Sequence, residues 1–343
     1  MAGQVSGEWS FPQPGRGWHR ASHFSAAAMA EMRLGDPGFV PEFAVIGTTS
    51  GGMSGGESFH RAQIARTRSR ERAEWLANYM PQKAVLDGLG VCGWNVPMQI
   101  IANACASGSN ALGHAFRLVR AGLHRAVLCG GYDAISELVF TGFDSLQAAT
   151  QEKVRPFDRG RTGLVLSEGA AMFAFEEWES AQRRGAPILA EITGYGLATD
   201  NHHLTQPHPS GIGPRLAMER ALADARRQPG DIDYINAHGT ATTFNDATEG
   251  IAIAQVFGDR VPVSSTKSMM GHSLGAAGAI EAAFCLLALR EGFLPPNINY
   301  READSAFALN IVANEARPAR LLRALSNSFG FGGTNASIVL EAA

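Results

Sequence analysis

The stretch MQIIANACASGSNALGHAFRLVRAG, residues 98–122, decides the fold. Its apolar run at 100–102 predicts a short buried strand. A helix is predicted directly after it, because apolar residues then recur with a helical period at Ala111, Leu112, Ala115, Phe116 and Val119. Cys105 lies at the joint. We therefore predict a strand, a tight turn that carries a thiol, and a helix.

A thiol at the start of a helix lies at the positive end of the helix dipole, close to free N–H groups. This position is expected to favour the thiolate of Cys105 and to lower its pKa. Ala104, Ala106 and residues 107–109 are all small, so a substrate carbonyl can approach the sulfur and the backbone amides closely. The alternative is that Cys105 is an unreactive thiol that packs as a small apolar residue. This stretch alone leaves both interpretations open.

Composition limits the classes of protein to consider. With 343 residues, 45% of them hydrophobic and 18% charged, the chain can bury one large core or two packed halves. A net charge of -3 gives no overall electrostatic case for binding nucleic acid or an anionic membrane. No apolar run approaches the roughly 18 residues of a membrane helix, and the first 20 residues do not resemble a signal peptide. The four cysteines lack metal or disulfide spacing, which fits a reducing cytoplasm.

Residues 1–21 combine proline, glycine and isolated aromatic side chains such as Trp9, Phe11 and Trp18, which predicts an irregular arm that covers a neighbouring surface. Strands and helices alternate after it. The predicted strands cover 43–46, 126–129, 171–175, 188–195, 232–235, 261–263, 321–325 and 336–341. The predicted helices cover 24–32, a charged solvated segment at 58–79, 214–225, 247–257 and 276–289. Such alternation implies mostly parallel sheets with helices on their faces.

Two segments share one pattern, which indicates two related halves. ACASGSNALGHAF (104–116) and GHSLGAAGAIEAAF (271–284) each place a reactive residue and small residues before an alanine-rich helix. We divide the chain into a half at 22–185, with Cys105, and a half at 186–343, with His238 and His272. Residues at the carboxyl ends of parallel strands can converge on one crevice. The thiol, the two imidazoles and the turn at 329–335 are therefore expected to be neighbours.

Four motifs in the sequence resemble those of one protein family. ACASGSN (104–110), NAHGTATTFND (236–246), STKSMMGHSLGAAGA (265–279) and NSFGFGGTNAS (327–337) occur together, and in the same order, in the elongating β-ketoacyl-[acyl carrier protein] synthases. The resemblance covers about residues 22–343. It implies a thiolase-like α/β fold with five layers, α/β/α/β/α, and usually a dimer. It also implies an acyltransferase that extends an acyl chain by condensation with a malonyl group.

The resemblance implies a role for each reactive residue. Cys105 accepts the acyl group as a thioester. His238 and His272 stabilise the enolate that forms when CO2 leaves the malonyl group, for which both imidazoles must be neutral. The backbone N–H groups of Cys105 and Phe331 hold the oxyanion of the condensation step.

Three further ionisable residues match the family's site. Lys267 matches the active-site lysine, and Glu249 matches the glutamate expected to bond to it. Asp246 occupies the neighbouring acidic position. Glu281, on the helix after His272, is expected to be a structural carboxylate.

Other residues are expected to contact the substrate. Thr240 and Thr242 resemble the hydroxyl pair that binds the phosphopantetheine arm. Phe329 and Phe331 resemble the aromatic side chains beside the thiol, with Phe331 as a gate between the acyl pocket and the arm tunnel. The remaining substrate-binding positions are Asn335, in the last motif, and Ser50, where elongating relatives often place a bulky gate. A small residue at position 50 would admit longer or stiffer acyl chains.

The expected partner is an acyl carrier protein, which brings its own phosphopantetheine, so neither a cofactor nor a metal is implied. Basic residues have to meet its acidic helix, and the arginines at 66, 68, 70 and 72 are the possible set. A homodimer, or a heterodimer with a chain-length-factor-like homologue, is expected. Nucleic acid is not expected as a partner.

Family members normally start with a buried strand that is absent here or replaced by the arm. A short form, a trimmed start site, or a partner that completes the sheet would each explain this difference. The candidate functions are primary fatty-acid elongation, a specialised polyketide or polyene system, a non-catalytic partner subunit, and a Cys/His hydrolase. The intact Cys105, His238 and His272 set argues against the partner subunit. The second histidine, Lys267 and the FGFGGTN turn argue against the hydrolase, and the first two functions remain open.

Overall fold

The computed structural model describes residues 2–5, 17–67 and 71–343. Its strands are β1 (Ala2–Gly3), β2 (Phe43–Gly47), β3 (Met98–Ile101), β4 (Ala126–Asp133), β5 (Leu166–Ser167), β6 (Gly169–Glu176), β7 (Ala190–Thr199), β8 (Tyr234–Asn236), β9 (Pro262–Ser264), β10 (Phe293–Leu294), β11 (Asn310–Ile311), β12 (Arg317–Pro318), β13 (Arg323–Gly330) and β14 (Thr334–Ala342). Its α-helices are α1 (Arg20–Gly35), α2 (Met53–Ile64), α3 (Arg72–Tyr79), α4 (Pro81–Cys92), α5 (Ser107–Arg120), α6 (Glu137–Ser145), α7 (Trp178–Arg183), α8 (Ile212–Ala225), α9 (Thr243–Phe257), α10 (Lys267–Met270) and α11 (Ala277–Glu291). Three 3-10 turns are η1 (Pro229–Asp231), η2 (Leu274–Ala276) and η3 (Phe331–Gly333).

Two large sheets repeat the same strand order. The first runs β3-β2-β4-β6, and the second runs β11-β9-β8-β13-β14-β7. In the first, β2 is parallel to β3 and β4, and β6 is antiparallel to β4. In the second, β8 is parallel to β9 and β13, and β14 is antiparallel to β13. This repeat is the duplication that the two related sequence segments predicted.

Within the described ranges, the first sheet contains no counterpart of β7. In the second sheet, β7 pairs antiparallel with the outer edge of β14. Among the residues that the structure describes, no strand pairs with the corresponding edge of β6. The sequence comparison with the family predicted this absence.

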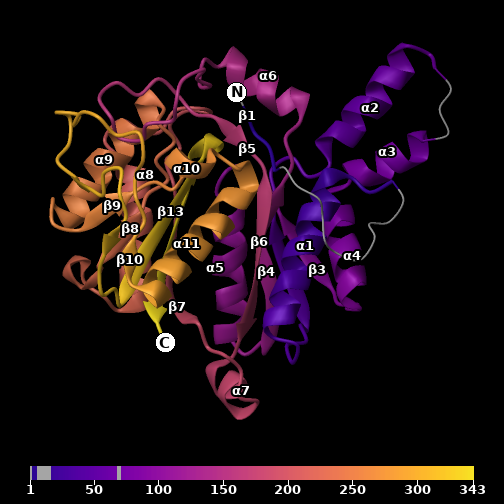
Figure 1. The fold of residues 1–343 in the computed structure, drawn as a ribbon, viewed down its shortest axis with the longest axis horizontal. Helices are drawn as coiled ribbons and strands as arrows, with labels where there is room; N and C mark the ends of the chain where they lie inside the picture. The colour runs from indigo at the N-terminus through magenta and orange to yellow at the C-terminus, as the bar shows by residue number, and fades with distance from the viewer. Residues whose placement is uncertain (1, 6–16, 68–70) are drawn as a thin grey trace.

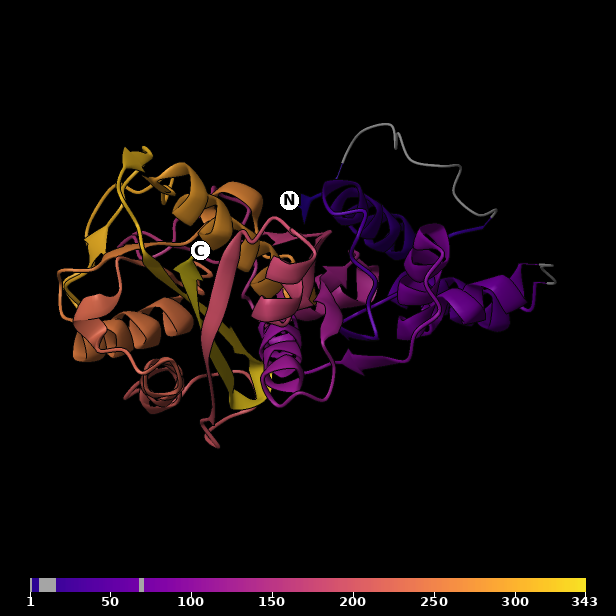
Figure 2. The same ribbon diagram turned by 90° about the horizontal axis from the view of Figure 1, so that it is seen from below.

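The helices complete five layers. α5 and α11 lie between the sheets, α1 and α4 cover the first sheet, and α8 and α9 cover the second (Figures 1 and 2). The two central helices approach closely because glycines face the contact. A Cβ on Gly108 would lie 2.8 Å from the backbone nitrogen of Ala279, and one on Gly278 would lie 2.3 Å from Ser109 Oγ. One apolar core joins both halves, with Leu112 of α5 and Ile338 of β14 among its buried side chains.

Some boundaries differ from the sequence prediction. The single helix expected at 58–79 is two helices, α2 and α3, which form a protruding hairpin (Figure 1). Arg66 breaks the helix, because its φ of 51° is incompatible with helical backbone. The predicted turn at 329–335 is shorter, since β13 continues to Gly330 and β14 begins at Thr334. Trp9 and Phe11 of the predicted arm lie outside the described residues.

None of the described helices has both the length and the apolar character needed to cross a membrane.

Candidate active site

Cys105 lies in the turn between β3 and α5, as predicted. The preceding residue, Ala104, has a φ of 55°, a conformation that non-glycine residues seldom adopt. Ser107 fixes this turn, because its Oγ accepts from the backbone N–H of Asn103 at 2.9 Å and donates to the carbonyl oxygen of Ala104 at 2.6 Å. Cys105 is only 6% exposed. The turn therefore holds the thiol inside the protein.

The expectation of a lowered pKa for the Cys105 thiol is wrong. Burial raises the pKa of Cys105 to about 12, and the ammonium group of Lys267 opposes this only in part. The dipole of helix α5 does not offset this rise in pKa, because α5 begins two residues after Cys105, at Ser107. Loss of water around the sulfur outweighs the helix dipole. The Cys105 thiol is therefore protonated at neutral pH.

This pKa predicts how Cys105 reacts with iodoacetamide. Each pH unit below the pKa lowers the thiolate fraction about tenfold, so the alkylation rate should rise about tenfold per unit between pH 7 and 10 without a plateau. Peptide mass mapping distinguishes Cys105 from the other three cysteines, which are also buried. A rate that levels off near pH 8 would contradict this prediction.

The two histidines come together although they lie on different turns. The ring centroids of His238 and His272 are 5.3 Å apart, with planes at 87°. His272 is held by backbone bonds, because its N–H donates to Val165 O at 2.7 Å and its carbonyl oxygen accepts from Ser167 N at 2.9 Å. The ring of Phe329 lies 5.8 Å from that of His238.

The end of β13 links the histidines to the thiol. Phe329 contacts His238, and the next residue, Gly330, is so close to the nucleophile turn that a Cβ on it would lie 3.1 Å from Cys105 N. A side chain here would press against that backbone, which would have to move by a few tenths of an ångström. The structure thus gathers Cys105, His238, His272 and the turn after β13 at one place.

Burial sets the protonation state of both imidazoles. It lowers the pKa of His238 and of His272 well below 6.5, and the positive charge of Lys267 lowers both further. Both rings are therefore neutral at neutral pH, as the sequence analysis required.

The partner expected for Lys267 is wrong. Lys267 forms its ion pair with Glu281, and both side chains are fully buried. Its Nζ also donates to His238 O at 2.6 Å and lies 3.3 Å from His238 Nδ1. Glu249 instead accepts from the backbone N–H groups of His238 at 2.8 Å and Gly239 at 2.7 Å. Spacing along the chain did not show that Glu281, on α11, faces the lysine.

The acidic residues of α9 hold the turn that carries His238. Burial raises the pKa of Glu249 to about 7, although its backbone bonds and Asn327 oppose this shift. Asn327 Nδ2 donates to Glu249 Oε1 at 3.2 Å. Asp246 accepts from Phe157 N at 2.7 Å and from Ala241 N at 3.1 Å. Both carboxylates are structural supports of the histidine turn.

Three predicted substrate-binding residues make bonds within the protein. The hydroxyls of Thr240 and Thr242 lie 2.9 Å apart and share a hydrogen bond. Asn335 Nδ2 donates to Asp200 Oδ1 at 2.6 Å and to Gly333 O at 2.9 Å, which ties the turn after β13 to the residue that follows β7.

Ser50 is part of a turn built around Asp133, which the sequence analysis missed. The buried Asp133 carboxylate accepts from the N–H and the hydroxyl of Ser50, both at 2.8 Å. It also accepts from other groups of residues 48–51 and from Gly275 N at 2.6 Å. Asp133 therefore joins the loop after β2 to the turn before α11. An acidic residue at the end of an otherwise apolar strand was the available signal.

The structure describes only two of the four arginines considered for docking, at positions 66 and 72. Arg68 and Arg70 lie outside the described residues. Arg72 donates to Ala62 O at 3.0 Å and also to Thr67 O, so its guanidinium ties α3 to α2.

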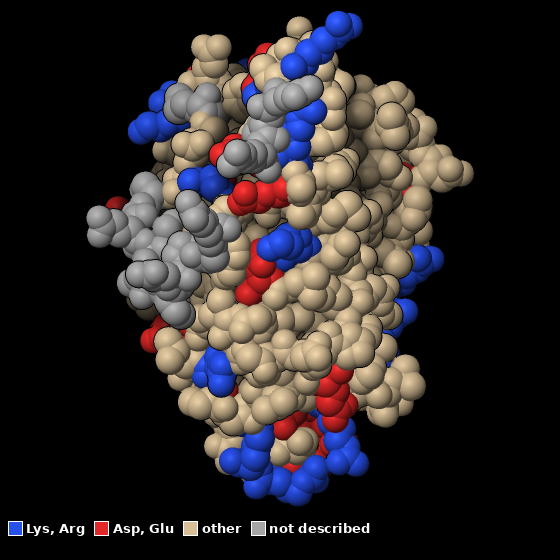
Figure 3. All heavy atoms as spheres, turned by 90° about the vertical axis from the view of Figure 1, so that its right-hand side faces the viewer, with Lys and Arg blue, Asp and Glu red and all other residues tan. Residues whose placement is uncertain are grey.

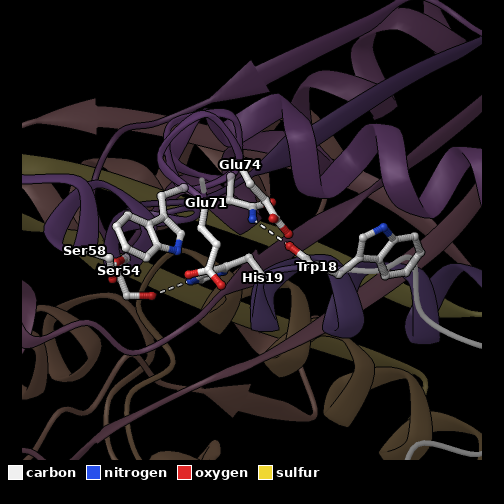
Figure 4. Close-up of a pocket in the computed structure, with 10 residues that line it drawn as sticks. Trp18, His19, Ser54, Ser58, Glu71 and Glu74 are labelled. Atoms are coloured by element: carbon white, nitrogen blue, oxygen red, sulfur yellow. Dashed lines mark hydrogen bonds between the residues drawn. The ribbon is translucent and has the colours of Figure 1, made fainter. Parts of the chain in front are cut away.

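A separate cavity of about 350 Å³ lies between the start of α1 and the α2–α3 hairpin (Figure 4). His19 Nδ1 accepts from Ala21 N at 3.1 Å, so the proton of the neutral ring is on Nε2, which donates to Ser54 Oγ. A histidine that donates to a serine cannot act as its base. This Ser–His pair is therefore not a nucleophile and base. The cavity is lined by Gly17, Trp18, His19, Ser54, Gly55, Ser58, Glu71, Glu74, Trp75 and Asn78.

Comparison with known proteins agrees with this geometry. The family model described as the beta-ketoacyl synthase N-terminal domain matches residues 37–181, and that described as the C-terminal domain matches residues 189–301. The chain is 40% identical to 3-oxoacyl-[acyl-carrier-protein] synthase 2 of Staphylococcus aureus over 308 residues, which are 86% of this chain and 76% of the relative.

Solved structures match almost the whole chain. The ishigamide ketosynthase/chain length factor superposes with a TM-score of 0.92 at 33% identity and covers 100% of this chain and 88% of that one. A type II polyketide ketosynthase in complex with its acyl-carrier protein, AntDE:AntF, gives a TM-score of 0.89 at 28% identity, with the same two coverages.

The fold and the gathered thiol and imidazoles are thus those of a thiolase-like condensing enzyme. The chain belongs to the β-ketoacyl synthase family. The five-layered duplicated fold predicted from the sequence is confirmed.

Proposed function

We propose that this protein catalyses the decarboxylative Claisen condensation of an acyl group, held as a thioester on Cys105, with malonyl-acyl carrier protein. The product is a 3-oxoacyl-acyl carrier protein that is two carbons longer. One observation carries the proposal. The neutral imidazoles of His238 and His272 lie 5.3 Å apart, beside the end of β13 that contacts Cys105.

The first step transfers the acyl group. The sulfur of Cys105 attacks the thioester carbonyl of the acyl carrier protein, and the phosphopantetheine thiolate leaves. Because burial keeps the resting thiol protonated, its proton must leave as the new bond forms. The departing phosphopantetheine thiolate takes up that proton, so charge and atoms balance.

The second step is decarboxylation, and Lys267 orients the imidazole that serves it. Its ammonium group, 3.3 Å from His238 Nδ1, donates to that nitrogen, so the ring carries its proton on Nε2. His238 then donates from Nε2 to the thioester oxygen of the malonyl group, and the neutral His272 ring supplies the second donor. Both bonds strengthen as negative charge develops on that oxygen and CO2 leaves.

The third step forms the carbon–carbon bond. The enolate carbon attacks the carbonyl of acyl-Cys105, and the backbone N–H groups of Cys105 and Phe331 stabilise the resulting oxyanion. Collapse of this intermediate expels the Cys105 thiolate. Thr240 and Thr242 bind the phosphopantetheine arm, which enters as part of the substrate. The protein needs no cofactor of its own.

The expected partners are an acyl carrier protein and a second ketosynthase-type subunit. On the face that Figure 3 shows, charged side chains gather at the upper and lower ends and in a small group near the middle, and broad uncharged surface lies between and beside them. The elements on this side expose Ile64, Leu76, Tyr79, Met80 and Leu86 to solvent. Such a surface is typical of an interaction site. We assign this surface to the interface of a dimer, formed with a second copy or with a chain-length-factor-like homologue. We expect the dimer to work in the cytoplasm.

The test follows the mass of the protein through one cycle. Incubation with acyl carrier protein thioesters should raise the mass by that of one acyl group. Malonyl carrier protein should then restore the original mass and yield a 3-oxoacyl product that is two carbons longer. Both steps are run alone and with a ketosynthase-like partner chain. Uptake of an acyl group without any extended product, under both conditions, would contradict the proposal.

The alternative is a non-catalytic partner subunit. The preserved thiol, imidazoles and buried Lys267–Glu281 pair speak against it, because a subunit without chemistry has no use for this costly buried charge.

A further inference from the structure

The aromatic ring of Phe331 stacks on a residue that no sequence motif singled out. The ring centroids of Phe331 and Phe143 are 5.4 Å apart, and their planes differ by 22°. Phe331 is the first residue of η3, directly after the strand end that contacts Cys105, and Phe143 lies on α6. The two elements belong to different halves of the chain.

The helix that carries Phe143 is attached to the body of the protein by apolar packing, by hydrogen bonds from its first turn, and by an ion pair between Glu137 and Arg61 of α2. None of its residues, all of which are described, is buried. Val139, Phe140 and Phe143 pack on a small cluster formed by Leu164, Leu166 and Leu274. At its start, Ser136 Oγ accepts from Val139 N at 3.3 Å, and Glu57 of α2 accepts from Leu138 N at 2.7 Å. α6 is therefore fixed without help from Phe331.

Phe331, by contrast, is followed by backbone that can change conformation. Gly332 and Gly333 have φ values of 80° and 76°, a region that glycine enters at little cost. The turn is tethered on its far side, where Gly332 N donates to Leu204 O at 2.7 Å. Among the described residues, the Phe331 ring makes its aromatic contact with Phe143.

We propose that Phe143 is a positioning residue that holds the Phe331 ring in its stacked place, next to the strand end that contacts Cys105, so that the ring must leave this stack when an acyl group enters. The inference rests on the proposed function only in taking Phe331 as the gate. An aromatic pair of this kind is a modest but specific contact, whose loss changes a closed-to-open ratio by about 2- to 10-fold.

Alkylation of Cys105 by iodoacetamide tests this directly, because the thiol is reachable only when the gate opens. At one fixed pH, Phe143→Ala should raise the alkylation rate about 2- to 10-fold, and Phe143→Tyr, which keeps the ring, should leave it unchanged. The matched control is Phe140→Ala, which removes a ring of similar burial from the same helix face. It should leave the rate within twofold of the unmodified protein.

Two results would overturn the proposal: an unchanged rate in Phe143→Ala, or an equal increase in Phe140→Ala, which would mean that α6 acts only as packing. If Phe143→Ala does not fold, Phe143→Leu replaces it with the same expectation. The assay uses no substrate, so it fails or succeeds independently of the condensation activity. In an active enzyme, the same variant should change the KM for the acyl carrier protein thioester more than kcat.

Discussion

Replacing His238 or His272 with alanine is expected to reduce CO2 release from malonyl-acyl carrier protein at least about 100-fold, while Cys105 still accepts an acyl group. Each ring supplies one donor to the oxygen that gains charge during decarboxylation. Removal of one preorganised donor typically costs about 10²–10³ in rate. Radioactive or isotopic CO2 measures the decarboxylation, and intact protein mass measures the acylation.

The control for this pair is His60→Ala, because His60 is exposed on α2, outside the site. It should leave both readouts unchanged. A histidine variant that releases CO2 at the normal rate would show that its ring does not serve the enolate. Loss of acylation together with decarboxylation would instead indicate that the site has collapsed.

Replacing Lys267 with methionine is expected to destabilise the protein by about 3–5 kcal/mol and to abolish decarboxylation. The substitution leaves the Glu281 carboxylate fully buried without its partner, which is the costly way to break a buried ion pair. It also removes the donor that sets the tautomer of His238. Denaturant unfolding gives the free energy, and the CO2 assay gives the rate.

A double variant separates these two effects. Lys267→Met combined with Glu281→Leu removes both charges, and such replacements are often neutral for stability. Stability should therefore recover while decarboxylation stays lost. Recovery of activity along with stability would show that Lys267 has only a structural role.

The sequence predicted the fold and the central residues because each is tied to a local pattern. Cys105, His238 and His272 each follow a strand within a glycine-rich turn, and parallel strands bring such turns to one edge. The duplication was visible because the same small-residue pattern precedes both central helices. The glycines Gly108 and Gly278 in those patterns allow the close helix contact that the structure shows.

Other features depend on contacts that no local pattern records. The pKa of Cys105 depends on how completely water is excluded, which outweighs the helix dipole that the sequence revealed. The choice of Glu281 over Glu249 as the partner of Lys267 depends on which face of α11 meets the lysine. Asp133 became meaningful only when the loop at 48–51 and Gly275 were seen to surround it.

The most direct test of this account is the intact mass of the protein after incubation with an acyl carrier protein thioester. The unmodified protein should gain one acyl group, mapped to the peptide that contains Cys105, and Cys105→Ala should gain none. An acyl adduct of the same size on Cys105→Ala would contradict the assignment of the nucleophile, and with it the carbon–carbon bond formation proposed for this site.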